Sequence, residues 1–166
     1  MADLTIYLGN KNYSSWSLRP WLVLKRTTVA FDEVVIPLYQ SGSRETVLKY
    51  SPSGRVPALR HGELTVWESL AICEYLAETF PNFELWPKDQ AARARARFGQ
   101  GGDFLFGQFT IVDAIYAPVV TRFRTYKIDL EREADAYCEA IMALPAMQEW
   151  ITAARNEPMI IEQYEF

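Results

Sequence analysis

Hydroxyl side chains between two apolar segments could activate a nucleophile in this chain. Tyr13, Ser14 and Ser15 follow the apolar run 4–8 and precede the apolar residues that begin at Leu18. A hydroxyl at the start of a helix can donate a hydrogen bond to an anion such as a thiolate, and the helix dipole favours the same charge. We therefore expect an anion-stabilising site here. The alternative is that the serines only cap a helix.

A second group of polar atoms is expected around a proline. Residues 51–59 (SPSGRVPAL) end in an apolar stretch in which Pro57 can occupy only the start or edge of a strand, because it has no N–H for the ladder. Val56 can then turn its own N–H and C=O toward a ligand, a geometry that a cis bond before Pro57 would fix. The sequence therefore predicts a peptide-like pair of hydrogen-bonding groups at Val56.

Glu68 and Ser69 open the next predicted helix. Thr65-x-x-Glu68 fits a capping box and Ser69 is itself a possible cap, so free N–H groups would lie beside Val56 and Pro57. A carboxylate could bind the hydroxyl and N–H of Ser69, while Glu68 accepts an ammonium group of the same ligand. Together these describe an amino-acid head group. The alternative is that both residues only cap the helix.

The elements that position these groups alternate between strand and helix. The first helix should be capped near Ser17, so that Pro20 lies in its first turn, where the missing N–H costs little. A strand, helix and strand of this length form a parallel, right-handed unit. The order βαβαββα is thioredoxin-like. We predict strands at 4–8 and 31–36, helices at 18–26 and 43–49, a hairpin with arms 56–59 and 64–66 around a His61–Gly62 turn, and a helix after residue 68.

The second half of the chain is predicted to be helical. Residues 81–89 contain prolines and have no hydrophobic periodicity, so we expect them to link two domains, 1–80 and 90–166. Helices are expected at 90–97, from 111 to about 123, at 130–144 and at 145–155.

The composition limits the partners and the compartment. Hydrophobic residues make up 49% of the 166 residues, so much apolar surface must be covered within the fold or by a partner subunit. The formal net charge of −4 argues against a protein that works mainly through nucleic-acid phosphates. No apolar run approaches the ~18 residues of a membrane span, and no basic leader precedes the first strand, so we expect a cytosolic location.

Metal and redox chemistry are not expected. Cys73 and Cys138 lie far apart, without Cys-x-x-Cys spacing, and are predicted to be small buried hydrophobes inside helices. His61 is the single histidine.

The Val-Pro and Glu-Ser motifs together resemble the glutathione site of the soluble glutathione transferases. That family has Val-Pro before its third strand, Glu/Gln-Ser at the start of its third helix, and a run like residues 71–76 (AICEYL). The resemblance implies that glutathione is bound by Val56, Pro57, Glu68 and Ser69.

Residues 14–19 (SSWSLR) are similar to the Ser-Ser-x-Ser-x-Arg motif of the zeta-class transferases. The resemblance implies that Ser14 is the catalytic donor to the thiol and that Ser15 is its neighbour in the pocket. The chain differs from the zeta class at Trp16, where that class has cysteine, and at Pro20.

The resemblance implies an activity as well as a fold. It implies a cytoplasmic, homodimeric transferase that conjugates glutathione to small electrophiles in detoxification, with glutathione as co-substrate and no metal. Neither nucleic acid nor membrane is expected as a partner. Tyr7 and Tyr13 are alternative donors to the thiol. The alternative function is a non-catalytic module of the same fold that binds glutathione or a protein.

The helical half resembles the same family. Residues 104–107 (FLFG) followed by Thr110-x-x-Asp113 are similar to its helical domain, in which the capped helix is the central one. Pro118 should kink or shorten this helix.

The resemblance is interrupted between Arg97 and Phe98. In the family two long helices lie here, whereas in this chain the start of one is joined to the end of the other, so we expect a shortened helical domain. The alternative is that the protein contains further residues between Arg97 and Phe98. An unbroken chain would place the Cα atoms of Arg97 and Phe98 ~3.8 Å apart. The loss would uncover apolar side chains on the first lobe, namely Trp21, Leu22, Leu70, Cys73 and Tyr75.

Overall fold

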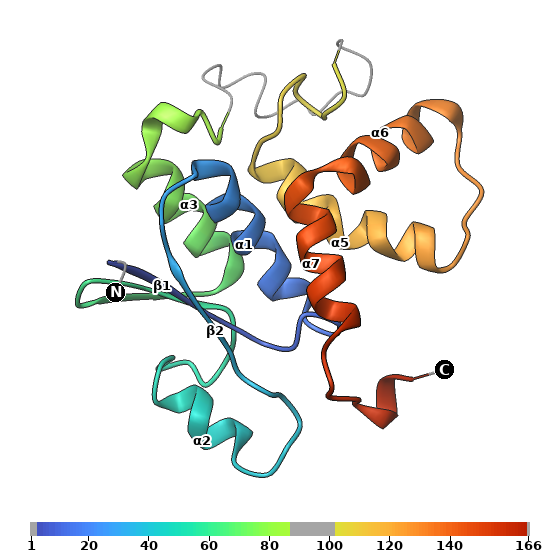
Figure 1. Ribbon diagram of the computed structural model, residues 1–166. Helices are drawn as coiled ribbons and strands as arrows, with labels where there is room; N and C mark the ends of the chain where they lie inside the picture. Colours follow the sequence, from blue (N-terminus) through green and yellow to red (C-terminus); the bar gives the residue numbers. More distant parts are fainter. Residues whose placement is uncertain (1–2, 87–101, 166) are drawn as a thin grey trace.

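The computed structural model describes residues 3–86 and 102–165, which form a lobe built on a β-sheet beside a lobe of helices (Figure 1). The predicted helix at 90–97 and the junction between Arg97 and Phe98 lie outside the described residues. The division into domains at 1–80 and 90–166 stays a prediction.

The sheet has four strands in the order β2-β1-β3-β4. The parallel first unit and the thioredoxin-like order of elements are confirmed. The hairpin turn lies at Gly62–Glu63, one residue later than predicted, because His61 pairs with Leu64. β1 (Leu4–Leu8) is parallel to β2 (Asp32–Val35) and antiparallel to β3 (Ala58–His61), which pairs in turn with β4 (Leu64–Trp67).

Helices cover both faces of the sheet. α1 (Ser15–Thr27) and α3 (Ser69–Thr79) lie on one face, and α2 (Ser43–Leu48) lies on the other (Figure 1). The side chains of β1 alternate between these faces, as the period of two requires. Leu4, Ile6 and Leu8 join the main core. Tyr7 joins a smaller core with Val47 of α2 and stacks on Tyr50 with 4.4 Å between ring centroids.

The first helix begins earlier than the hydrophobic pattern suggests. Its N-cap is Ser14, whose Oγ accepts a hydrogen bond from the backbone N–H of Ser17 at 3.3 Å. The predicted cap near Ser17 is therefore wrong, since Ser17 is already helical. Pro20 consequently lies in the second turn and not in the first.

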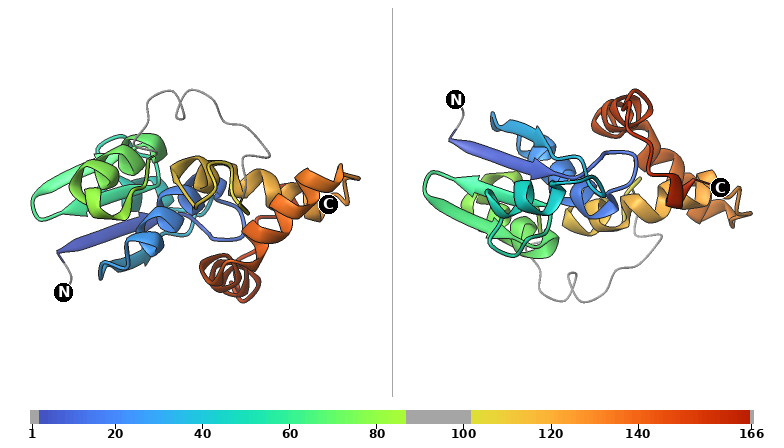
Figure 2. Two further views of the ribbon diagram at one scale, coloured as in Figure 1. Left: turned by 90° about the horizontal axis from the view of Figure 1, so that it is seen from above. Right: turned by 90° about the horizontal axis from the view of Figure 1, so that it is seen from below.

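In the part of the chain that the structure describes, the second lobe contains α5 (Ile111–Thr125), α6 (Arg132–Ala143) and α7 (Pro145–Arg155). Seen from above and below, these helices lie beside the sheet lobe and not over its face (Figure 2). α1 contacts both α5 and α7, so it forms the seam between the lobes. Two short 3-10 helices, η1 (Pro81–Phe83) and η2 (Glu162–Tyr164), follow α3 and precede the C-terminus.

The central helix α5 begins at the predicted capping pattern. Thr110 N–H donates to Asp113 Oδ2 at 2.8 Å, and Leu105 N–H donates to Oδ1 at 3.1 Å. Burial raises the pKa of Asp113, against these hydrogen bonds, which lower it. The helix continues to Thr125 although Pro118 lies inside it, so this proline does not shorten the helix, and the alternative expectation of a kink stays a prediction.

The described part of the chain does not leave the first lobe uncovered as expected. Trp21, Leu22 and Cys73 are fully buried in the main core, and only Leu70, 47% exposed, and the half-buried Tyr75 retain access to solvent. The reason is that α1 is enclosed by α3 on one side and by α5 and α7 on the other.

Both cysteines are buried, as predicted. Burial raises the pKa of the Cys73 thiol to about 12, so this side chain is not a nucleophile at neutral pH. In residues 3–86 and 102–165, no group of three His, Cys, Asp or Glu side chains could hold a metal ion. None of the helices described there has the length and apolar character needed to cross a membrane.

Candidate functional site

Ser14 stands at the end of the loop that joins β1 to α1. Its backbone N–H donates to the Asn10 carbonyl at 2.8 Å, which closes a tight turn before the helix. The side chain is largely buried and caps α1. Ser14 is therefore a helix cap whose hydroxyl lies at the positive end of α1, and its role as donor to a thiol stays a prediction.

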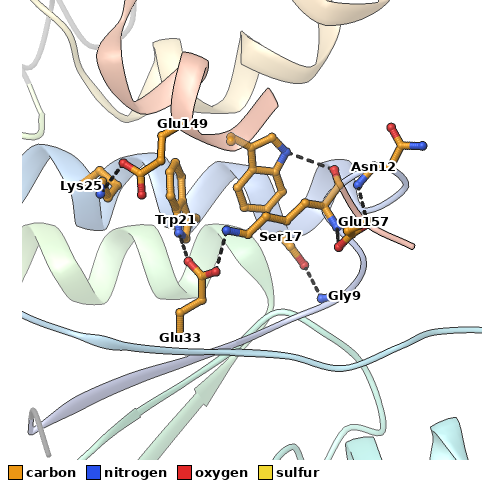
Figure 3. Close-up of polar contacts among 10 residues, drawn as sticks. Gly9, Asn12, Ser17, Trp21, Lys25, Glu33, Glu149 and Glu157 are labelled. Carbon is orange, nitrogen blue, oxygen red and sulfur yellow. Dashed lines mark hydrogen bonds and ion pairs between the residues drawn. The ribbon is translucent and has the colours of Figure 1, made fainter. Parts of the chain in front are cut away.

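Ser17 holds this hydroxyl in place. Ser14 Oγ–H donates to Ser17 Oγ at 2.8 Å. Ser17 Oγ also accepts a hydrogen bond from Gly9 N–H at 3.0 Å, as Figure 3 shows. A hydroxyl hydrogen can rotate to another acceptor, and a charged acceptor makes a stronger bond than a neutral one. The Ser14 hydroxyl can therefore turn from Ser17 to a thiolate without moving its oxygen.

Pro20 explains how the starts of α1 and α3 are joined. In a helix, the N–H of residue 20 would bond to the carbonyl of Trp16, but proline has no N–H. Ser69 Oγ–H donates to this Trp16 carbonyl at 2.8 Å instead. Ser69 is buried, and its hydroxyl proton is committed to the protein, so the expected ligand carboxylate would meet only its N–H.

Glu68 is the N-cap of α3. Its carboxylate accepts hydrogen bonds from Leu70 N–H at 3.0 Å and from Ala71 N–H at 3.3 Å. Thr65 lies in β4, so the predicted capping box from Thr65 to Glu68 is wrong, and Ser69 is the first helical residue and not the cap. The carboxylate thus fills part of the anion site that we expected at this helix end.

The backbone of Glu68 is strained. Its φ of 80° lies in the left-handed region, which a residue with a side chain rarely adopts. Such strain persists where surrounding contacts enforce it, and it is frequent in binding sites.

The peptide bond between Val56 and Pro57 is cis, as the sequence suggested. Pro57 directly precedes β3, where it takes no place in the ladder. The preceding residues, Gly54, Arg55 and Val56, form part of the wall of a cavity on the α2 side of the sheet.

Two cavities meet at Ser14. The inter-lobe cavity, about 470 Å³, lies among the Lys11–Ser15 segment, α5 and α7. The α2-side cavity, about 640 Å³, lies among the same loop, α2 and residues 54–56. Both cavities are lined by Asn12, Tyr13, Ser14, Arg122 and Tyr126.

The predicted site residues are divided between these surfaces. Ser14 and Val56 line the α2-side cavity, and Ser15 lines the inter-lobe cavity. Glu68 and Ser69 line neither of the two, but Ser69 is bonded to Trp16, which does line the α2-side cavity. The structure therefore brings Ser14 and Val56 to one cavity, and it links Ser69 to that cavity through the hydrogen bond to Trp16.

Arginines that the sequence did not single out line both cavities. Arg122 of α5 reaches both, Arg44 and Arg55 line the α2-side cavity, and Arg124 and Arg155 line the inter-lobe cavity. Among the residues described, no aspartate or glutamate lines either cavity. Opposite charge favours the ionised form of an acid, so this lining favours anionic ligands. No local pattern marks these arginines, since the fold alone brings them to Ser14.

Arg19 adds positive charge behind Trp16. Its guanidinium lies 3.9 Å from the centroid of the Trp16 ring, a cation–π contact. Burial, and then the neighbouring charge of Arg122, lower the pKa of Arg19 from its ordinary value.

The two tyrosines that were alternative donors are occupied elsewhere. Tyr7 is buried against α2 and lines neither cavity. Tyr13 lines both, but its hydroxyl donates to Glu165 at 2.5 Å and accepts from Ile161 N–H at 3.1 Å. Ser14 is the hydroxyl left at the junction of the cavities on this loop.

The fold and the site define a two-lobed protein with a thioredoxin-like sheet and a hydroxyl at a positive helix end. Residues 13–79 match the family model of the glutathione S-transferase N-terminal domain, and residues 88–153 match that of the glutathione S-transferase C-terminal domain. The chain belongs to the glutathione S-transferase family.

Named relatives include both transferases and isomerases. The chain is 36% identical over 92 residues to a probable maleylacetoacetate isomerase of Caenorhabditis elegans, and 36% identical over 93 residues to glutathione S-transferase 1 of Dianthus caryophyllus. Each match covers 55% of this chain, and 42% and 41% of the respective relative. The chain thus spans about two fifths of the length of these relatives.

Solved structures share the fold. A Burkholderia glutathione transferase homolog with bound glutathione superposes with a TM-score of 0.77 at 24% identity, covering 93% of this chain and 99% of the other. A bacterial maleyl pyruvate isomerase, described as a zeta-class glutathione S-transferase, gives 0.78 at 20% identity, covering 93% and 100%.

Proposed function

We propose that this protein binds glutathione in the α2-side cavity and joins it, through its sulfur, to a small electrophile in the inter-lobe cavity. The observation that carries the proposal is the position of Ser14, which lies at the N-terminus of α1 where the two cavities meet. A glutathione thiol at this junction would contact the Ser14 hydroxyl while the rest of glutathione occupies the α2-side cavity. The same thiol would face an electrophile in the inter-lobe cavity.

The charge of the α2-side cavity suits glutathione. The tripeptide carries two carboxylates and one ammonium group at neutral pH. Arg44, Arg55 and Arg122 line the cavity and offer partners for carboxylates. An extended peptide spans ~3.3–3.6 Å per residue, so a tripeptide covers roughly 10 Å.

The glutathione contacts that we propose follow the sequence motifs. The central peptide pairs with the backbone of Val56 beside Pro57, and the γ-glutamyl end points toward Glu68 and Ser69, past Trp16. Glu68 accepts the ammonium group, and the N–H of Ser69 meets the carboxylate.

The chemistry requires a larger thiolate fraction than free glutathione has. A free thiol has a pKa of ~8.5, so little thiolate is present at neutral pH. The Ser14 hydroxyl, the end of α1 and the Arg122 charge all favour the anion. The sulfur then attacks the electrophilic carbon and forms a C–S bond, and the leaving group departs with its bonding electrons.

Isomerisation of an acidic substrate is the second candidate function. The inter-lobe cavity is lined by Arg122 and Arg155, which suits a substrate with carboxylates. Lys11 and Arg124 also line it, but their charges are paired with Glu33 and Asp135. Reversible addition of the thiolate to a conjugated double bond permits rotation about that bond, and loss of the sulfur regenerates free glutathione. Relatives named maleylacetoacetate isomerase agree with this alternative.

A homodimer in the cytoplasm is proposed as the working form. The outer strand β4 and the start of α3 carry three exposed apolar side chains, Leu64, Trp67 and Leu70. A second copy of the chain would cover them.

Ser14→Ala tests the proposed function. We expect glutathione affinity within about twofold of the unsubstituted protein, and conjugation of 1-chloro-2,4-dinitrobenzene slowed about a hundredfold, because proton-donor contacts typically contribute 10²–10⁴-fold. Calorimetry measures the affinity, and product absorbance measures the rate. Ser41→Ala is the control, since Ser41 is exposed and lines neither cavity.

The other outcomes decide between the alternatives. Binding without turnover of this electrophile or of a cis-unsaturated dicarboxylic acid supports the non-catalytic module. Turnover of the acid alone supports the isomerase. Failure to bind glutathione overturns the proposal, and loss of activity in Ser15→Ala but not in Ser14→Ala moves the donor.

A further inference from the structure

The loop before Ser14 is held from the far end of the chain. Lys11 N–H donates to Glu157 Oε1 at 2.7 Å, and Asn12 N–H donates to Glu157 Oε2 at 3.1 Å (Figure 3). One carboxylate therefore accepts two successive backbone N–H groups of the loop. Glu157 lies two residues beyond α7, in the second lobe.

Lys11 is fixed in two further directions. Its carbonyl accepts a hydrogen bond from Trp150 Nε1 at 3.1 Å. Its buried ammonium pairs with Glu33 of β2 at 2.5 Å and lies 5.1 Å from the ring centroids of Trp21 and Trp150. A lysine held by a strand, a helix and the chain beyond that helix has little freedom to move.

Residues 157–165, which we call the C-terminal strap, include Glu157 and also contact the next loop residue, Tyr13. Its Ile161 N–H donates to the Tyr13 hydroxyl, and Glu165 accepts from that hydroxyl. Loop residues 11, 12 and 13 are thus all bound by the strap, directly before Ser14.

The turn at residues 10–14 couples the position of Ser14 to the positions of Lys11 and Asn12. Tyr13 N–H and Ser14 N–H both donate to the Asn10 carbonyl, at 3.1 and 2.8 Å, so residues 10–14 move together. A hydrogen bond to a reacting atom is sensitive to small displacements, and a misplacement of ~1 Å can cost ~10²-fold in rate.

We propose that Glu157 is a positioning residue, which fixes the loop so that the Ser14 hydroxyl meets the glutathione sulfur. This inference rests on the proposed function. Glu157 lines neither cavity and touches no substrate, so it acts only through the backbone of Lys11 and Asn12. The second lobe thereby contributes to thiol activation in the first.

Glu157→Gln tests the proposal, because the amide keeps the shape of the side chain but turns an NH₂ group toward one of the two N–H donors. Amide hydrogen exchange of either Lys11 or Asn12, whichever faces the NH₂ group, should accelerate roughly tenfold or more when measured without ligand, because that amide loses its acceptor. The pKa of bound glutathione, read from ultraviolet absorbance of the thiolate, should rise toward ~8.5. The kcat should fall roughly ten- to a hundredfold, with glutathione Kd within about threefold.

Glu149→Gln is the matched control. Glu149 lies on α7 and pairs with Lys25 at 2.6 Å, but it does not contact the loop (Figure 3). All three measurements should remain as in the unsubstituted protein. Trp150→Phe gives a second test, since it removes the hydrogen bond to the Lys11 carbonyl and keeps an aromatic ring; it should shift the same three measurements in the same direction.

The outcomes separate this inference from the proposed function. If the unsubstituted protein forms no glutathione thiolate, the proposed function and the positioning role are both overturned. If it does, and Glu157→Gln leaves amide exchange or thiolate pKa unchanged, only the positioning role is overturned. Glu157→Asp, which keeps the carboxylate, should restore part of the kcat, and no restoration alongside a fully folded protein also counts against the role.

Discussion

At the scale of single residues, the junction between Trp16, Pro20 and Ser69 shows how one missing N–H organises the site. Pro20 has no N–H to donate to the Trp16 carbonyl within α1. The hydroxyl of Ser69, from α3, donates to this carbonyl instead. A proline that usually weakens a helix interior here leaves a carbonyl free for a contact between two helices. This contact fixes Trp16, and thus one wall of the α2-side cavity.

A double-mutant cycle tests this explanation. Ser69→Ala should lower the free energy of unfolding by ~0.5–1.5 kcal/mol, because the Trp16 carbonyl loses its hydrogen bond from Ser69. In a Pro20→Ala background the same change should cost less by ~0.5 kcal/mol or more, since the new Ala N–H bonds to that carbonyl. Urea unfolding measures both. Equal costs in the two backgrounds would contradict the explanation.

At the scale of elements, the start of α3 combines a cap with backbone strain. Glu68 caps Leu70 and Ala71 while it holds a φ of 80°. A left-handed backbone costs ~1–3 kcal/mol for a residue other than glycine. The carboxylate therefore has a structural role in α3 whether or not it also binds a ligand.

Two substitutions at Glu68 separate the roles. Glu68→Ala loses the cap and keeps the strain, so the free energy of unfolding should fall by ~1–2 kcal/mol. Glu68→Gly relieves the strain and caps almost as well, so stability should be equal or higher. Both should weaken glutathione binding by ~1.5–3 kcal/mol, the range for a hydrogen bond to a charged group.

Calorimetric titration and thermal unfolding measure the two effects. Glu78→Gln, an exposed change on the same helix, is the control. Unchanged glutathione affinity in both Glu68 variants would restrict this residue to its capping role.

At the scale of the whole molecule, the two lobes share one site. α1 is packed by α3 of its own lobe and by α5 and α7 of the other. Arg122 of α5 lines the inter-lobe cavity together with Ser14. Glu157, which follows α7, accepts a hydrogen bond from the loop between β1 and α1. Neither lobe alone contains the complete arrangement around Ser14.

The exposed apolar face of β4 and α3 is the proposed homodimer interface. Trp67, 45% exposed, lies on the outer strand between Leu64 and Leu70. Trp67→Glu should convert a homodimer into a monomer, because a charge cannot be buried there without a partner. Light scattering during size-exclusion chromatography measures the mass.

Ile128→Glu is the control for the assembly. Ile128 is 50% exposed but lies between α5 and α6, away from β4. A monomeric unsubstituted protein, or a dimer that persists in Trp67→Glu, would contradict the proposed interface.

The sequence by itself determined the features that depend on neighbouring residues. The alternation at 4–8 predicted β1 with its true bounds, and Pro145 and Arg155 marked the true ends of α7. The pattern Thr110-x-x-Asp113 predicted the cap of α5. Each depends on interactions within a few residues, which composition and spacing record.

Only the tertiary structure decided which groups surround Ser14. Arg122 has no local pattern that separates it from a surface arginine, and Glu157 is an ordinary glutamate after a helix. The start of α1 differs from the prediction in part for the same reason, because Gly9 and Ser69, which lie outside the helix, form hydrogen bonds with Ser17 and with the Trp16 carbonyl in its first turn. Contacts between residues far apart in sequence depend on how the lobes pack, and no short stretch of the chain encodes that packing alone.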